Sequence, residues 1–335
     1  MLARNIAFKL LHQIDSTELF SDTVLNSDIM ETIDIRDRRL VTEIVYGALR
    51  RKYNLDHILG ISSSRPWHEV ESSTKTLLRM SLYQLWFMDR IPDHAVVNDA
   101  VEMAKIYIRG NTYRYLNGIL RHLARTRPWE EENYARDTPK WIRVSLPRWL
   151  WKRWVARYGE AVAEEYAESL NQPPQTALRH FGGLPSDELK HSLRPSELVP
   201  NAYIKRTSLE GPALSNLNNF QFQDEASQLI PYLLGNTRGW HIWDACAAPG
   251  GKASIFCRMV GDKGRVVASD HSKKRAMYLK DVLDPELFPR ALVLVADAGT
   301  SAPFNRRYDA VFADVPCSGL GTIRRNPEIK WRFRP

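Results

Sequence analysis

The stretch "HIWDACAAPGGKASIFCRMV", residues 241–260, decides the fold of the C-terminal part of this chain. A short apolar segment leads through a pair of glycines into an amphipathic segment, a pattern that predicts a strand, a tight turn and a helix. Three more short apolar segments follow, at 265–270, 291–297 and 308–314. Because the helical segments "KASIFCRMV" and "SKKRAMYLKDVL" separate the first three strands, we expect a parallel sheet with right-handed crossovers.

Three of these four predicted strands end in an acidic residue. Asp270, Asp297 and Asp314 end the later segments, and Gly250 and Gly251 follow the first. Since ligands bind at the carboxyl ends of parallel strands, we expect these residues to share one pocket. Asp270 lies twenty residues beyond Gly250, the spacing at which an acid meets a ribose hydroxyl in nucleotide-binding sheets. The pattern therefore predicts a cofactor that contains a nucleoside.

The glycine spacing narrows the choice of cofactor. It lacks the G-x-G-x-x-G pattern of dinucleotide sites, which disfavours a dehydrogenase, and Cys246 and Ala253 occupy the positions where a P-loop needs Gly and Ser or Thr. A nucleoside cofactor without phosphate, S-adenosylmethionine, fits better. Asp270 would then accept from the ribose hydroxyls, and Asp297 from the adenine amino group.

Residues 1–130 show a helical period rather than a strand period. Ile6 and Leu10 share one helical face, and later segments as far as "TYRYLNGILRHLAR" repeat this spacing. The pattern predicts a compact helical bundle. Pro128 and the polar run up to residue 139 predict a linker after it.

Residues 140–235 have a mixed pattern. The segment "SLPRWLWKRWVARYG" predicts a helix between Pro147 and Gly159, whereas "NQPPQTALRHF" and "AYIKR" predict short strands. Three tryptophans of the helical segment are expected to be core or interface residues: Trp149, Trp151 and Trp154.

The net charge of +8 is concentrated in two stretches. Residues 103–129 contain six basic residues and no acid, and the last fifteen residues contain five basic residues and one acid. Such stretches indicate a polyanionic partner, although solvated helix faces would also explain the first one. In the second stretch Trp331 and Phe333 lie among the basic residues, a mixture that suits unstacked bases.

The three cysteines are too few, and odd in number, for a disulfide framework, so we expect a reducing, cytoplasmic location. No Cys and His cluster has the spacing of zinc ligands. No apolar run is long enough to cross a membrane, and the N-terminus lacks the pattern of a signal peptide. We therefore expect neither a metal nor a membrane partner.

Two motifs, "DACAAPGGKA" and "DVPCSGLGTIRRNPEIKW", resemble those of the RNA cytosine carbon-5 methyltransferases of the NOP/Sun family. "FQDEASQLIP" (222–231) is similar to that family's lead-in to the cofactor domain. "DRRLVTEIVYGALR" and "VVNDAVEMAK…YLNGILR" resemble the NusB-type RNA-binding bundle. One departure is "LRHF" (178–181), where the family tends to have Asn after Val, which puts an RNA contact of the middle domain in doubt.

The resemblance implies a multidomain α plus α/β fold. A NusB-like helical RNA-binding domain would span 1–135, a small mixed α/β domain 140–225, and a Rossmann-like class I methyltransferase domain, incomplete at its C-terminus, 226–335. It also implies S-adenosylmethionine-dependent methylation of carbon-5 of a specific cytidine in small-subunit (16S) ribosomal RNA, by a monomer.

The resemblance assigns roles to residues at the strand ends. Asp314 would hold the flipped base and assist catalysis. Cys317 would help product release, because the family's nucleophile is a second cysteine in a Thr-Cys motif on the next strand. The implied cofactor-binding set is Cys246, Ala247, Ala248, Pro249, Gly250, Gly251, Lys252, Asp270, Asp297 and Asp314.

The sequence contains no Thr-Cys pair before it ends at Pro335. We therefore expect a fragment of a longer enzyme that is catalytically inactive by itself. In this class of sheet the fourth strand lies beside the first and a fifth pairs beyond the fourth. We expect "YDAVFAD" (308–314) to lack that outer neighbour, and Val311 and Phe312 to lose part of their burial.

Three alternatives stay open at this point. A DNA-type cytosine methyltransferase would use Cys317 as its nucleophile, but that assignment leaves the NusB-like bundle unexplained. An RNA-binding or assembly protein would carry an incomplete catalytic domain. Cys317 would otherwise be a plain buried thiol, while we expect Cys246 to contact the cofactor through its backbone and Cys257 to be a core residue.

Overall fold

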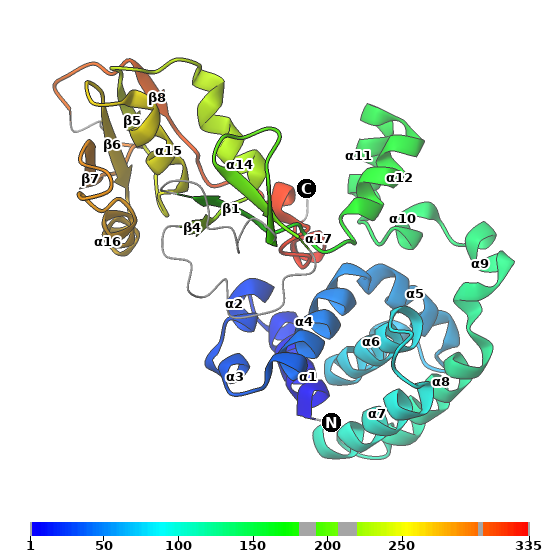
Figure 1. Ribbon diagram of the computed structural model, residues 1–335. Coiled ribbons are helices and arrows are strands. Elements are labelled where there is room, and N and C mark those ends of the chain that lie inside the picture. The colour runs from blue at the N-terminus through cyan, green and yellow to red at the C-terminus, as the bar shows by residue number, and fades with distance from the viewer. Residues whose placement is uncertain (1, 181–191, 207–219, 301–303, 334–335) are drawn as a thin grey trace. The chain divides into compact units, whose positions relative to one another are not determined.

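The computed structural model describes residues 2–180, 192–206, 220–300 and 304–333, and it contains two compact units (Figure 1). The helical unit comprises Met1–Pro174 and Ser318–Pro335, and the sheet unit comprises Gln175–Cys317. The chain thus leaves the helical unit after Pro174 and returns to it directly after Cys317.

The last residue of "LRHF" (178–181) and the last two residues of the chain, 334–335, lie outside the described residues. Within the described part of the chain, no helix has the length and hydrophobicity needed to cross a bilayer. The predicted division into domains 1–135, 140–225 and 226–335 stays a prediction, because compactness alone does not show which parts fold independently.

The N-terminal part of the helical unit is the predicted helical bundle. Its apolar stripes meet in one core, in which Ile44, Leu77 and Leu120 are completely buried. The bundle is formed by α1 (Leu2–Ser16), α2 (Ser21–Leu25), α3 (Asp28–Glu31), α4 (Ile35–Arg50), α5 (Lys52–Ser62), α6 (Ser72–Phe87), α7 (Asp93–Tyr107) and α8 (Thr112–Thr126).

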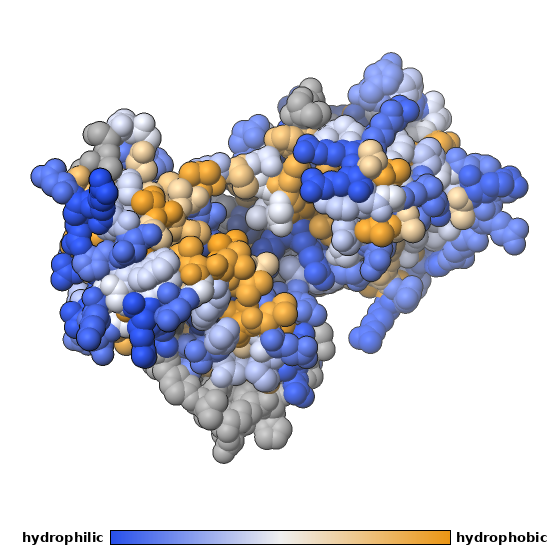
Figure 2. Space-filling view, turned by 90° about the horizontal axis from the view of Figure 1, so that it is seen from above, coloured by the Kyte–Doolittle hydropathy of each residue, from blue (hydrophilic) through white to orange (hydrophobic). Residues whose placement is uncertain are grey.

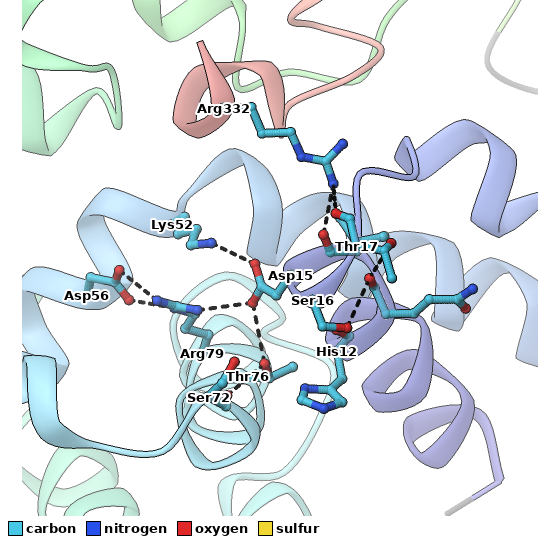
Figure 3. A network of polar contacts seen from close by, with 12 residues as sticks. His12, Asp15, Ser16, Thr17, Lys52, Asp56, Ser72, Thr76, Arg79 and Arg332 are labelled. Atoms are coloured by element: carbon cyan, nitrogen blue, oxygen red, sulfur yellow. Dashed lines mark hydrogen bonds and ion pairs between the residues drawn. The ribbon is translucent and has the colours of Figure 1, made fainter. Parts of the chain in front are cut away.

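Polar contacts fix the bundle at two places. Asp34 caps α4 by accepting from the backbone amides of Arg36 and Asp37, which otherwise have no partner inside the helix. The second place is a charged network between α1, α5 and α6 (Figure 3). There Asp15 accepts from Lys52 Nζ at 2.7 Å and from Arg79 Nη1 at 3.1 Å.

Arg79 completes this network by binding both carboxylate oxygens of Asp56, at 2.6 and 2.9 Å. Although burial opposes ionisation of Asp15, the charges of Lys52 and Arg79 lower the pKa of that carboxyl group. The network therefore joins α1, α5 and α6, and each charged side chain in it lies next to one of opposite charge.

The predicted linker at 128–139 is wrong in one respect, because it contains the short helix α9 (Glu132–Asp137). Tyr134 of α9 packs edge-on against Trp86 of α6, with 5.6 Å between the ring centroids. Its hydroxyl also accepts from Asn54 Nδ2 at 3.2 Å. Contacts between residues far apart in the sequence thus order a segment whose local composition indicated a loop.

The predicted tryptophan-rich helix is α11 (Arg148–Tyr158), which lies between Pro147 and Gly159 as expected. It packs with α10 (Lys140–Arg143), α12 (Glu160–Ser169) and α17 (Ile329–Arg332). Trp151 is buried, and Trp149 and Trp154 pack against the same apolar cluster. The three tryptophans are therefore core residues of the helical unit.

The last described segment, residues 318–333, is bound tightly to the helical unit. Glu328 Oε1 accepts from the backbone amide of Ser21 at 2.7 Å. The guanidinium of Arg332 donates to carbonyl groups at the end of α1, among them those of Ile14 and Thr17 (Figure 3). Lys330, 1% exposed, donates to carbonyl and amide oxygens of the same unit.

The sheet unit contains the predicted parallel sheet. Its strands are β5 (His241–Asp244), β6 (Arg265–Asp270), β7 (Ala291–Val295) and β8 (Ala310–Phe312), in the order β7-β6-β5-β8. Helices α15 (Gly251–Val260) and α16 (Lys273–Val282) connect the first three strands. The first and fourth strands are adjacent, as predicted, with Trp243 paired to Val311.

β8 is the edge of this sheet within the described residues. Val311 is 60% exposed, whereas Phe312 is half-buried against Phe256 of α15, at 5.1 Å between ring centroids. Figure 2 shows apolar residues gathered on the surface of the sheet unit, at the left of the view. Other large apolar residues exposed in this unit include Phe222, Leu233 and Val315.

A smaller antiparallel sheet precedes the parallel one. It consists of β1 (Ala177–His180), β2 (Leu193–Pro195), β3 (Ala202–Lys205) and β4 (Phe220–Phe222), in the order β2-β3-β1-β4. Strands β1 and β3 are those predicted from "NQPPQTALRHF" and "AYIKR". A helix, α14 (Glu225–Leu229), follows β4 and begins at the side-chain cap of Asp224.

Candidate functional site

The glycine pair forms a turn that few other residues could replace. Gly250 has a φ of 107°, and a Cβ there would come within 2.9 Å of the Leu279 and Val282 side chains on α16. At Gly251 a Cβ would lie 3.0 Å from the side-chain amide of Gln223. The loop therefore approaches its neighbours at van der Waals distance, and α15 begins directly after it.

Arg179 of the antiparallel sheet forms hydrogen bonds with this loop and with the first turn of α15. Its Nη1 donates to the carbonyl oxygen of Gly251 at 2.8 Å, and its Nη2 donates to Ser254 Oγ at 2.5 Å. The side chain is 3% exposed, and burial lowers its pKa to about 10. The smaller sheet thus positions the first turn of α15, a role that the sequence did not reveal.

A cavity of about 150 Å³ lies in front of the loop. Seven of the eleven residues predicted for the site line it: Cys246, Ala247, Ala248, Pro249, Gly251, Lys252 and Asp314. Gln223 and Asp244 also line it, and sequence reasoning missed both. The available signal for Asp244 was that "HIWD" also carries an acid at its carboxyl end.

Asp244 has an unusual environment. It is 1% exposed, and no hydrogen bond of good geometry reaches its carboxylate oxygens within the described residues, although the backbone of Cys246 is close enough to lower its pKa. Burial raises its pKa to about 7, a shift that the charge of Lys252 only partly offsets. A buried carboxylate that faces a cavity without a partner is suited to a cationic or hydrogen-donating ligand.

Lys252 and Asp314 form an ion pair at the mouth of this cavity. Lys252 Nζ donates to Asp314 Oδ2 at 2.6 Å, and the Asp314 side chain is 53% exposed. The structure therefore joins the first helical turn after the glycine loop to the segment that contains Cys317.

The remaining predicted residues, Gly250, Asp270, Asp297 and Cys317, do not line this cavity. Asp270, 2% exposed at the end of β6, accepts from the backbone amide of Ser272 at 3.0 Å and lies 3.2 Å from Arg275 Nη2. Arg275 also donates to the carbonyl oxygen of Ala248 at 2.9 Å. Asp297 is exposed, and its Oδ1 accepts from the amide of Gly299.

The three cysteines have three different environments. Cys317 is exposed, so the alternative of a buried structural thiol at that position is wrong. Cys257 is buried in the core, where burial raises its pKa to about 12, as expected for a core residue. Cys246 is half-buried, and burial followed by the nearby charge of Asp244 raises its pKa.

A basic surface lies on α7 and α8 of the helical unit. A hollow of about 280 Å³ is lined there by residues that include Lys105, Arg114 and Arg121. Arg114 and Arg121 are exposed and donate to neutral groups, the Tyr113 hydroxyl and the Asn117 side chain. Lys105, by contrast, is paired with Glu102.

Comparisons with known proteins agree with both parts of this architecture. Residues 1–125 match the NusB family. Residues 231–335 match the family described as 16S rRNA methyltransferase RsmB/F. The crystal structure of PH0851 superposes on 99% of this chain and 78% of its own length, with a TM-score of 0.73 and 20% identity, which shows a shared fold.

These matches define a methyltransferase in which a NusB-like helical domain precedes a Rossmann-like domain. The ribosomal RNA small subunit methyltransferase B of Shigella flexneri is 31% identical over 325 residues, which cover 91% of this chain and 72% of that protein. A probable ribosomal RNA small subunit methyltransferase B of Bacillus subtilis is 29% identical over 99% of this chain and 77% of its own length. The chain belongs to the ribosomal RNA small subunit methyltransferase B family.

Proposed function

We propose that this protein belongs to the enzymes that transfer a methyl group from S-adenosylmethionine to carbon-5 of a cytidine in 16S ribosomal RNA. The observation that carries the proposal is the unpartnered carboxylate of Asp244, which lies in one cavity with the glycine loop and Asp314. The names of the relatives support ribosomal RNA as the substrate.

The residues present fit the proposed cofactor. Its amino acid end carries a positive charge, which would satisfy the buried carboxylate of Asp244. Gln223 has a buried side-chain oxygen without a partner in the described residues, and this oxygen is a second acceptor at the same cavity. The cavity of about 150 Å³ is smaller than typical small-molecule sites, so the nucleoside would extend along the strand ends towards Asp270 and Asp297.

When bound, the cofactor supplies an electrophilic methyl group. Carbon-5 of cytosine is a weak nucleophile, and addition of a cysteine thiolate to carbon-6 makes it reactive. Carbon-5 would then take the methyl group from the sulfonium sulfur, which would leave as a neutral thioether. A base would next remove the carbon-5 proton, which restores the ring and releases the thiolate. Asp314 is proposed to hold the extruded base by accepting a hydrogen bond from the amino group next to its ring nitrogen.

An ion pair with Lys252 supports this proposed role of Asp314. The ion pair at 2.6 Å fixes one carboxylate oxygen, Oδ2, and leaves Oδ1 for the base. Cys317 follows three residues later on an exposed segment, where its thiol is accessible to a substrate. We propose that Cys317 assists release of the product, since the family's attacking cysteine belongs to a Thr-Cys motif.

The 335-residue polypeptide contains no Thr-Cys pair. The proposal therefore predicts that this polypeptide binds cofactor and RNA without transferring a methyl group. Three cysteines, an odd and small number, fit the reducing cytoplasm in which such an enzyme would work.

The test uses tritiated S-adenosylmethionine and unmodified small-subunit RNA. The polypeptide should retain cofactor in an Asp244-dependent manner but incorporate no tritium above a control without enzyme. A chimera in which a further strand with the family's Thr-Cys motif follows Pro335 should methylate carbon-5 of cytidine. Methylation by the 335-residue polypeptide itself would overturn the roles given to the cysteines, and a chimera without activity would contradict the proposal.

A further inference from the structure

The largest of the cavities described in this protein lies in the helical unit, apart from the glycine loop, and has a volume of about 350 Å³. Its walls come from three segments that are distant in the sequence: α2 and α4, the two prolines after α12, and the segment that follows Cys317. Seven residues of its lining carry the argument: Asp22, Glu43, Tyr46, Arg50, Pro173, Pro174 and Asn326.

Arg50 gives the cavity a buried donor. The residue is 5% exposed, and its Nε has no hydrogen-bond partner within the described residues. Its guanidinium lies over the ring of Tyr46, 4.9 Å from the ring centroid. Burial is the main cause that lowers the pKa of Arg50, and the charge of Glu43 opposes the shift. A ligand that accepts hydrogen bonds would therefore relieve an unsatisfied buried group.

Carboxylates supply the opposite chemistry at the same cavity. Glu43 lies two helical turns before Arg50 on the same face of α4. Its Oε1 accepts from the Tyr83 hydroxyl at 2.5 Å, which leaves Oε2 for a ligand. Asp22 is a second exposed carboxylate in the lining, and Asn326 Oδ1 is a buried acceptor without a partner in the described part of the chain.

This combination excludes simple ions as ligands. Two carboxylates disfavour a phosphate, and the buried guanidinium disfavours a cation. The flat apolar walls of Tyr46, Pro173 and Pro174 suit an unstacked ring, as in the recognition of single-stranded RNA. Guanine matches the polar pattern: its O6 and N7 accept from arginine, and its amino group donates to a carboxylate.

We propose that this cavity binds an unpaired guanine of the RNA substrate, read by Arg50 and Glu43. The inference rests on the proposed function, because it assumes that RNA is the substrate. It adds a second nucleotide site, separate from the one at Asp314. Residues 325–326, which line the cavity, follow Cys317 by eight and nine positions in the sequence.

The test measures fluorescence anisotropy of the 335-residue polypeptide with single-stranded oligouridines of about ten nucleotides at fixed salt. One central uridine is replaced by guanosine, 7-deazaguanosine, inosine or adenosine. A single guanosine should tighten binding about tenfold. Removal of N7 in 7-deazaguanosine, or of the amino group in inosine, should each abolish most of this gain, and adenosine should give none.

Two variants assign the contacts to residues. Arg50→Met should remove the guanosine gain and lower 7-deazaguanosine binding much less, because that analogue offers arginine only O6. Glu43→Gln, at an exposed position that keeps an acceptor for Tyr83, should remove the gain without affecting the fold and leave inosine binding unchanged. Arg65→Met is the matched control, because Arg65 lies 4.9 Å from the Tyr115 ring centroid but does not line the cavity.

Three results would overturn the proposal: a guanosine gain that survives both variants, equal affinity for all oligonucleotides, or preference for adenosine. Failure here is distinguishable from failure of the proposed function. If only the guanine site is wrong, RNA without guanosine still binds and cofactor binding still depends on Asp244. If the proposed function is wrong, cofactor binding or methylation by the chimera is lost.

Discussion

Lys330 Nζ donates a hydrogen bond to the carbonyl oxygen of Arg50 at 3.1 Å, although 280 positions of sequence separate the two residues. The same ammonium donates to Ser145 O and to Asn171 Oδ1, each at 3.0 Å. One buried side chain therefore joins α4, the turn before α11 and the end of α12 to the segment after Cys317. It also fixes the end of α4 at which Arg50 lines the guanine cavity.

Replacement of Lys330 should change the pH dependence of stability. Burial lowers its pKa to about 7 from the value of 10.5 in an unfolded chain. Between these pH values the unfolded state binds more protons, so the contribution of Lys330 to stability rises with pH, by up to about 1 kcal/mol per pH unit. Lys330→Met should lose this rise.

Urea unfolding of the wild-type protein and the variant at pH 7 and 9.5 provides the measurement. The difference between their unfolding free energies should be larger at the higher pH. Lys9→Met, on an exposed lysine of α1, is the control and should follow the wild type. Parallel pH profiles for Lys330→Met and the wild type would contradict the prediction.

Asp244→Asn should have opposite effects on folding and on cofactor binding. The variant removes a buried carboxyl group whose pKa burial raises to about 7, so the cofactor-free protein should become more stable above that pH. The affinity for S-adenosylmethionine should fall, since the neutral amide cannot compensate a positive charge.

Titration calorimetry over pH 5.5 to 8 would measure the loss of affinity for S-adenosylmethionine and show whether it follows the charge of Asp244. In the wild type the affinity should decline below about pH 7, where Asp244 becomes protonated, and the variant should show a flatter profile. Asp309→Asn, at the opposite end of the sheet beside His241, is the matched control. An unchanged affinity in Asp244→Asn would remove this residue from the cofactor site.

Charge reversal at Arg114 and Arg121 should weaken binding to RNA and reduce its salt dependence. Both side chains are exposed on the basic surface of α8 and donate only to neutral groups among the contacts described above. Each phosphate contact that is lost should lower the slope of log affinity against log salt by about 0.7 to 0.9.

The control is the double variant Arg136→Glu and Arg153→Glu, which changes the net charge equally at exposed positions of α9 and α11. A filter-binding titration of all three proteins against salt distinguishes a local contact from a general effect of charge. Equal slopes for the two double variants would show that the α8 arginines form a solvated face.

The role of Cys317 can be tested with RNA that contains 5-fluorocytidine. Fluorine replaces the hydrogen on carbon-5, so the elimination step is blocked and a covalent bond between enzyme and RNA persists. If Cys317 assists release, the 335-residue polypeptide should form no adduct on a denaturing gel, with or without Cys317→Ala. An adduct that disappears in Cys317→Ala, but persists in Cys246→Ala, would identify Cys317 as the nucleophile and favour the DNA-type mechanism.

The sequence determined the elements whose pattern is local. Helical period in residues 1–130 and alternating strands after residue 240 were sufficient for the bundle and for the parallel sheet, because side-chain periodicity follows directly from backbone geometry. The need for glycine at Gly250 was also visible, since a strand that turns sharply into a helix requires it. Asp314 and Lys252 were likewise predicted as members of one pocket.

Only the tertiary structure decided which groups lack a partner and which distant segments meet. Asp244 is a site candidate because burial leaves its oxygens unsatisfied, and burial depends on how the strands and α15 pack. The last fifteen residues looked like a basic stretch suited to RNA, yet Lys330 and Arg332 are bound to carbonyl groups of the helical unit. The physical reason is that a one-dimensional pattern records the charge of a side chain, whereas its role depends on the dielectric and the partners that folding places around it.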